Sequence, residues 1–225
     1  MRCSIASSLV IALLALAGSA AADATFSLRW RDTGSRSLAI LPGDAAGGGQ
    51  RQLDLYLEID VLWAGHGVTV AVPEAGGVSV DGIQLWDSSE VFGDSFFCCD
   101  PSLTLDLASW PQLDGFSEAY SFISLMSIPH GPPWAAPGEY LVGTLDVNTS
   151  SATGAVEIES MFLAGLDGLL VDDGTGTEVF SDDATFLNAT LGTAQLFIVP
   201  EPATAVLLAG GLVALGITRR RSTRR

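Results

Sequence analysis

Residues 53–61 alternate strictly between apolar and polar side chains, and this alternation limits the choice of fold more than any other feature of the chain. The apolar members of the run are Leu53, Leu55, Leu57, Ile59 and Val61. A period of two sends successive side chains to opposite faces of a β-strand. The pattern therefore predicts a strand that points its leucines into a core and leaves Asp54, Glu58 and Asp60 outside.

Similar stretches recur between turn-forming residues, at 68–72, 103–107, 116–128, 139–147 and 156–159. The third of these also allows a helical face through Phe116, Tyr120, Ile123 and Leu125, and we interpret it as a strand. In the fourth of these, Leu141, Leu145 and Val147 are expected to share one face. Residues 78–80 and 83–86 flank Asp81-Gly82, a dipeptide that favours a hairpin turn. Several short strands at this spacing predict an all-β fold, an antiparallel β-sandwich such as a jelly roll.

The N-terminal 22 residues are typical of a secretory signal peptide. Arg2 supplies a minimal positive region, and residues 9–17 form an apolar run. Ala20-Ala21-Ala22 then offers a small-residue cleavage site before Asp23. We therefore expect an N-terminal signal helix at 1–22 that is removed on export.

The C-terminal end has the composition of a membrane anchor. Residues 203–218 carry no charge, and as a helix of 16 residues they would span about 24 Å. Arginines follow directly and favour a cytoplasmic C-terminus; they are Arg219, Arg220, Arg221, Arg224 and Arg225. The sequence thus predicts a transmembrane helix at 203–218 and an extracytoplasmic domain at 23–199.

This tail resembles the PEP-CTERM sorting signal of Gram-negative bacteria. Val199-Pro200-Glu201-Pro202 matches the short motif of that family, and the apolar run and basic end follow in the same order. The resemblance implies processing by an exosortase, a membrane protease or transpeptidase, with Pro200, Glu201 and Pro202 as the sorting motif. It also implies anchoring by the C-terminal helix at first, then location at the cell surface or in an extracellular, polysaccharide-rich biofilm matrix.

Part of the middle domain is similar to cohesin-type or carbohydrate-binding-module-like sandwiches. The similarity lies in residues 137–147, where Pro137-Gly138 precedes a long strand pattern. It implies a cohesin-like sandwich as the alternative to a jelly roll, and it identifies no binding residue.

The predicted exported domain is strongly acidic. It holds 25 of the chain's 26 carboxylate residues, because only Glu201 falls outside it, against four arginines and no lysine. The arginines are Arg29, Arg31, Arg36 and Arg51, and the formal net charge is −21. Such a surface repels nucleic acid and anionic lipid and attracts divalent cations or basic partners. The alternative interpretation is that the negative charge serves solubility through mutual repulsion between molecules.

Acidic residues between 167 and 183 form a candidate calcium site. Asp167, Asp172, Asp173 and Glu178 lie close together in a stretch rich in glycine and alanine. Calcium prefers six to eight oxygen ligands, which such loops supply. The EF-hand spacing is absent, and the alternative interpretation is a solvated acidic loop.

Trp134, in Pro132-Pro133-Trp134, is a candidate sugar-stacking residue. The domain has four further tryptophans, and for most of the five the alternative is core packing, because tryptophan is usually buried. Catalysis finds less support. His66 and His130 are expected in loops, and no Ser-His-Asp, zinc or G-x-S-x-G spacing includes them.

Cys98 and Cys99 stand side by side, and three states remain open for them: a vicinal bridge, a bond between chains, or two free thiols. The whole pattern predicts an exported, non-catalytic structural or binding module of the cell envelope or extracellular matrix. Its expected partners are an exosortase and extracellular polysaccharide, and not nucleic acid. The alternative is a secreted hydrolase that acts on matrix polysaccharide.

Overall fold

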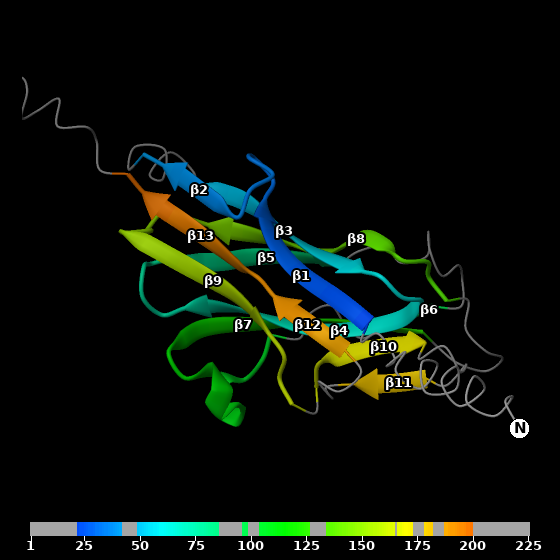
Figure 1. Cartoon of the computed structure of the whole chain (residues 1–225). Coiled ribbons are helices and arrows are strands. Elements are labelled where there is room, and N and C mark those ends of the chain that lie inside the picture. The colour runs from blue at the N-terminus through cyan, green and yellow to red at the C-terminus, as the bar shows by residue number, and fades with distance from the viewer. Residues whose placement is uncertain are drawn as a thin grey trace, which may run out of the picture.

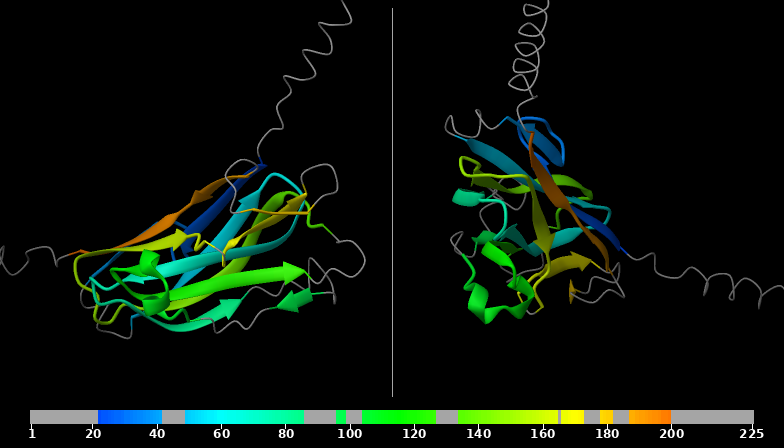
Figure 2. Two further views of the ribbon diagram at one scale, coloured as in Figure 1. Left: turned by 90° about the horizontal axis from the view of Figure 1, so that it is seen from below. Right: turned by 90° about the vertical axis from the view of Figure 1, so that its left-hand side faces the viewer.

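The computed structural model describes residues 22–41, 49–85, 96–98, 104–126, 134–164, 166–172, 178–181 and 187–199. Most of them lie in β-strands, which form two sheets packed face to face (Figure 1). The views along and across the strands in Figure 2 show the two layers and the short helical segment beside them. The predicted all-β sandwich is confirmed. The expected transmembrane helix at 203–218 lies outside the described residues, and so does the expected signal helix at 1–22 except for Ala22, which begins the first strand.

The first sheet has five strands in the order β12-β1-β3-β8-β5. Their bounds are β1 Ala22–Trp30, β3 Gln50–Ile59, β5 Ser79–Leu85, β8 Gly138–Asn148 and β12 Leu187–Leu191. The central strand β3 pairs antiparallel with β8 along its whole length and with β1 from Leu53 to Ile59. This strand contains the run whose alternation the sequence shows most clearly.

The second sheet follows the order β11-β10-β4-β9-β13-β2, with β7 paired to β4 and β6 paired to β7. Its strands are β2 Ser37–Ile40, β4 Trp63–Pro73, β6 Phe96–Cys98, β7 Phe116–Met126, β9 Ala155–Met161, β10 Gly168–Asp172, β11 Glu178–Ser181 and β13 Thr193–Ile198. The strand predicted over 116–128 is therefore present. Among the described residues, no helix is both long and apolar enough to cross a bilayer.

Two of the strand pairs are parallel, which the sequence does not predict. β12 runs parallel to β1 in the first sheet, and β13 runs parallel to β2 in the second. Gly192 joins β12 to β13, so the chain changes sheets at this residue. A Cβ at Gly192 would lie 2.7 Å from the carbonyl oxygen of Phe26, so only glycine lets β1 lie this close.

The core fills the space between the inner faces of the two sheets. Leu55, Leu57 and Ile59 point into it, as the alternation predicts, and Glu58 and Asp60 are exposed. Asp54 also lies on the outer face but is only 4% exposed, because other polar side chains cover it. The largest fully buried side chains are Trp30, Trp63, Phe26 and Phe122.

A smaller apolar cluster covers the outer face of the second sheet. It consists of Ala71, Leu105, Leu113, Ala119 and Leu163. The strand predicted over 103–107 is wrong: Thr104 makes only an isolated bridge, and the 3-10 helices η2 Leu107–Ser109 and η3 Pro111–Leu113 follow. Asp106 caps the first of these by accepting a hydrogen bond from the Ala108 N–H, which draws the chain into a helical turn.

The hairpin predicted at Asp81-Gly82 is also wrong. β5 continues through both residues and stays paired with β8, with a bulge between Val80 and Gly82. The Asp81 carboxylate accepts hydrogen bonds from the Gln50 and Asn148 side chains, both at 3.0 Å. These contacts hold a turn-forming residue within a strand.

Candidate functional site

The outer face of the five-stranded sheet carries a continuous set of polar side chains, here called the polar face. It consists of Arg29, Arg31, Gln52, Asp54, Tyr56, Glu58, Glu139, Thr144 and Asp146. Strand register brings these residues together. Arg29 lies opposite Asp54, and Asp54 lies opposite Thr144. Because the inner face of each strand is apolar, the period of two leaves the polar residues on the outside.

An ion pair that is buried on one side lies at the centre of the polar face. Arg31 donates from Nε to Asp54 Oδ2 at 3.0 Å and from Nη2 to Asp54 Oδ1 at 2.5 Å. Thr144 Oγ1 donates to the same Oδ1 at 2.8 Å. The hydrogen bond to Asp54 raises the pKa of Arg31. Both carboxylate oxygens of Asp54 thus accept hydrogen bonds, and the Arg31 side chain that covers them is partly exposed to solvent.

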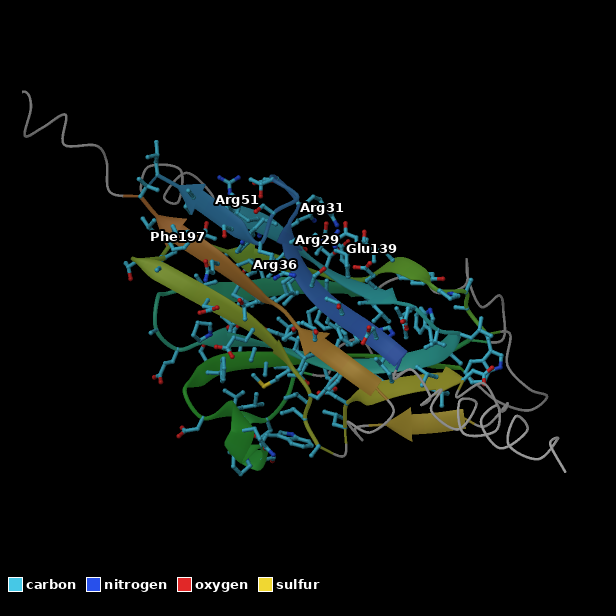
Figure 3. The ribbon with its side chains drawn as sticks, in the orientation of Figure 1. Arg29, Arg31, Arg36, Arg51, Glu139 and Phe197 are labelled. Carbon is cyan, nitrogen blue, oxygen red and sulfur yellow. The ribbon has the colours of Figure 1, made fainter. Side chains whose placement is uncertain are left out.

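A second ion pair crosses β3 beside the first. Arg29 Nη2 donates to Glu139 Oε2 at 2.5 Å, and both residues are labelled in Figure 3. The guanidinium carbon of Arg29 lies 4.6 Å from the centre of the Tyr56 ring. The hydrogen bond from Arg29 lowers the pKa of Glu139, and the same bond raises the pKa of Arg29. An arginine packed on a tyrosine offers a partner both apolar area and charge.

Amides extend the network toward the end of the face. Arg31 also donates to Gln52 Oε1, and Gln52 Nε2 donates to Asp146 Oδ1 at 2.9 Å. Hydrogen bonds therefore link Arg31, which follows β1, to side chains of β3 and β8. A charged side chain held by two partners loses little further rotamer freedom when another molecule binds it.

A β-bulge in β8 shapes this face. Tyr56 pairs with Leu141, although Leu55 pairs with Gly143, so β8 holds one extra residue here. Leu141 therefore lies on the outer face with Tyr56, and Tyr140 turns inward to meet the Trp63 ring. The prediction that Leu141 shares a face with Leu145 and Val147 is wrong for this reason.

Of the candidate calcium residues, only Asp167 and Asp172 have described side chains, and they lie at opposite ends of β10. Asp167 precedes β10 and Asp172 ends it, so their Cα atoms lie about 16 Å apart at roughly 3.3 Å per residue. Asp173 and the Glu178 side chain fall outside the described residues. No group of three His, Cys, Asp or Glu side chains suited to a metal ion occurs in the part that is described.

Asp167 has a different environment from the one expected of a calcium ligand. It is buried on the outer face of the second sheet, and its carboxylate accepts hydrogen bonds from Thr69 Oγ1 at 2.7 Å, Ser121 Oγ at 3.2 Å and the Leu163 N–H at 2.8 Å. Burial raises its pKa, and these three donors oppose the rise. Asp167 therefore fastens the β9–β10 connection to β4 and β7.

Trp134 is half-buried and packs against the main core. Its neighbour Ala135 pairs with Trp63 through two backbone hydrogen bonds. Trp30 and Trp63 are fully buried, and Trp110 packs on the smaller cluster, which agrees with core packing for these three. Trp86 and the sorting residues Pro200, Glu201 and Pro202 lie outside the described residues, as do Cys99 and the Cys98 side chain.

The sequence predicted a loop at His66, and this prediction is wrong, because His66 lies in strand β4. It is 1% exposed, and its ring lies 5.8 Å from that of Trp63 and 6.3 Å from that of Phe26. Burial lowers its pKa to about 3. His66 is therefore a neutral core residue at ordinary pH. His130 lies outside the described residues.

The sequence did not identify the polar face as a site. The available signal was that the polar members of the alternating run are Asp54, Tyr56 and Glu58, while Arg29 and Arg31 alternate with Leu28 and Trp30. That signal marks outward positions on single strands. It does not show that the strands are neighbours.

No family model matches the chain, and no curated protein matches it. Among solved structures, it is similar to the cohesin CaCohA2 from Clostridium acetobutylicum, with a TM-score of 0.45 and 10% identity over 79% of this chain and 91% of that one. It is also similar to a cohesin module of a family 33 glycoside hydrolase from Clostridium perfringens (TM-score 0.43, 10% identity, 80% and 98% covered). A non-cellulosomal cohesin from Archaeoglobus fulgidus has a TM-score of 0.40 and 9% identity, with 81% and 94% covered. These likenesses are distant, and the architecture described above rests on the strand pairing itself.

Proposed function

We propose that the chain is an exported, tail-anchored and non-catalytic module that binds an extracytoplasmic protein through its polar face. The observation that carries this proposal is the pair of neighbouring ion pairs on this face, Arg31–Asp54 and Arg29–Glu139, with Arg29 also packed on the Tyr56 ring. Tyrosine and arginine are the residue types most enriched where a few contacts dominate protein binding. A rigid sheet with its charged groups already oriented reduces the ordering cost of association.

The charge of the domain indicates the chemistry of the partner. The exported segment carries −21, and its four arginines all fall between residues 29 and 51. Two of these arginines lie on the polar face, beside the carboxylates of Asp54, Glu58, Glu139 and Asp146. A partner with basic groups opposite these carboxylates, around an acidic or apolar centre opposite the arginines, would complement the polar face. The net negative charge of the domain would also attract such a partner over long range.

The carboxylates of the polar face already have structural roles, which supports a binding function more than the hydrolase alternative. Asp54 accepts from Arg31 and Thr144, Asp146 accepts from Gln52, and Glu139 accepts from Arg29. Glycoside hydrolysis needs one carboxyl group to act as an acid and a second as a base or nucleophile. Lowering the pKa of Glu139 works against the first of these roles.

Chemical cross-linking of the full chain in the envelope of the producing cell tests the proposal. We expect one or a few proteins to be captured by the wild type and lost with Arg29→Ala combined with Tyr56→Ala. Glu157→Ala combined with Glu159→Ala, on the outer face of the other sheet, is the matched control and should retain them. The captured protein is then purified and titrated directly, with salt expected to weaken binding.

A glycan array gives the outcome that would contradict this assignment. Binding to a polysaccharide that survives the Arg29/Tyr56 double change and is lost with Trp134→Ala would move the site to Trp134. The partner would then be a carbohydrate and not a protein.

Anchoring and processing of the tail form a separate part of the proposal. The motif at 200–202, the apolar run and the terminal arginines support it. Mass spectrometry of the mature protein from a host with an exosortase is expected to show that the terminal arginines are gone. Surface-exposed protein that retains Arg225 would contradict processing and leave the binding proposal standing.

A further inference from the structure

Exposed apolar side chains gather at one end of the sandwich, where β2 and β13 finish and β9 begins. Among the described residues, four large hydrophobic side chains are exposed, and three of them lie at this end: Leu41, Phe197 and Val199. Phe197 pairs with Ala39 on one side and with Ala155 on the other, and both alanines are exposed. These five residues are here called the apolar end.

Strand register puts the apolar end on a single surface. The inward residues of the same strands are Leu38, Ile40, Val156 and Leu196, so Ala39, Ala155 and Phe197 all face outward. Val199 continues this alignment, since its N–H donates to the Ile40 carbonyl at 2.9 Å. Along these three strands the first charged side chain is Glu157, one pair further from the end.

The chain leaves the domain from the apolar end. Val199 is the last described residue, and Figure 3 shows Phe197 beside the point where the ribbon ends. The uncharged run predicted to cross the membrane begins at Ala203. Four residues reach at most about 14 Å when fully extended, and the headgroup layer of a bilayer is roughly 5–8 Å deep on each side. With the run from Ala203 in the membrane, Val199 would lie at most about 14 Å from the hydrocarbon core.

We propose that the apolar end docks onto the lipid surface from which the tail emerges, with Phe197 as its main contact. This inference rests on the tail anchor of the proposed function. Apolar and aromatic side chains gain by entering the boundary between headgroups and acyl chains. The β3–β4 turn lies at the opposite end of the strands (Figure 1), beside the start of β1. Docking through the apolar end would therefore point that turn away from the membrane.

Photo-cross-linking of the full chain in phosphatidylcholine–phosphatidylethanolamine vesicles tests the proposal. Benzoylphenylalanine replaces Phe197 in one variant and Leu62 in the control. Both native side chains are 39% exposed, and Leu62 lies at the far end of the strands. Flotation with the vesicles is measured first, and adducts are then identified by mass spectrometry. A third variant, with the label at Leu41, carries the test if the label at 197 prevents folding.

Each outcome decides between docking and its alternatives. Lipid adducts from position 197 or 41, several-fold above those from position 62, support docking. Flotation without lipid adducts at 197 and 41 overturns docking but leaves the anchor intact. Equal adducts from 62 also overturn it. A protein–protein adduct through 197 shows that a second copy covers the apolar end, and a chain that fails to float overturns both the anchor and the docking.

Discussion

Gly143 on β8 lies directly under the ring of Phe122 on β7, at a point where the two sheets meet. A Cβ built on Gly143 would be 2.3 Å from Phe122 Cδ1 and 2.4 Å from Cε1. Phe122 is fully buried, so its ring has little room to move away. Because Gly143 has no side chain, β8 and β7 can approach each other closely at this point.

Gly143→Ala is expected to destabilise the fold by about 1–3 kcal/mol, the range for overpacking a filled core. Denaturant unfolding measures the change. Gly138→Ala is the matched control on the same strand, because a Cβ there meets only ordinary contacts beginning at 3.5 Å. Combining Gly143→Ala with Phe122→Leu should recover part of the loss. A Gly143→Ala variant as stable as the wild type would contradict the close approach.

Leu57→Ala is expected to cost about 2–5 kcal/mol, since Leu57 is fully buried in the central strand and the change leaves a cavity. Leu41→Ala removes the same atoms from an exposed position and should change the unfolding free energy by less than about 0.5 kcal/mol. Equal effects from the two changes would mean that the inward face of β3 has been misidentified.

The inward face of β3 could be predicted from sequence because its period depends on one strand alone. Leu55, Leu57 and Ile59 stay buried whichever strands lie beside them. The errors at Leu141 and at Asp81-Gly82 have a different origin. A bulge inserts one residue relative to a partner strand, and the partner cannot be known from the strand's own pattern.

The polar face could not be predicted for a related reason. Arg29 and Glu139 are 110 positions apart, and the register of β1, β3 and β8 alone makes them neighbours. His66 misled differently, because flanking glycines usually indicate a turn. A Cβ at Gly67 would lie 3.1 Å from the Asp167 Cα, so glycine serves close packing of the β9–β10 connection here.

The Arg31–Asp54 pair predicts an asymmetry between its two partners. The Asp54 side chain is only 6% exposed in the wild type, and Arg31→Ala removes the charged donor that its carboxylate bonds. The change should cost about 1–3 kcal/mol. The Arg31 side chain is 43% exposed, so water can hydrate its guanidinium when Asp54 is removed. Asp54→Ala should therefore destabilise the fold less than Arg31→Ala. Glu139→Ala, in the more exposed pair with Arg29, should cost at most about 1 kcal/mol. Chemical denaturation at neutral pH compares the three, and an Asp54→Ala variant less stable than Arg31→Ala would contradict the assignment.

His66 predicts a loss of stability in mild acid. Its pKa is lowered to about 3 in the folded protein, against about 6.5 when unfolded, because burial disfavours the charged ring. The unfolded state therefore binds the proton first as pH falls through 6.5, and the folded state is penalised by about 1.4 kcal/mol per pH unit down to pH 3. Above pH 6.5 both states are neutral at this residue, and the effect vanishes.

Other groups also titrate in this window, and the prediction is therefore a difference between two proteins. His66→Phe keeps an aromatic ring beside Phe26 and Trp63 but cannot be protonated. Unfolding free energies of the wild type and His66→Phe, measured from pH 7.5 to pH 4.5, should diverge below pH 6.5, with the wild type losing more. The constant offset from repacking cancels in the slope. Parallel curves across that range would show that His66 is protonated in the folded protein and is not enclosed by the core.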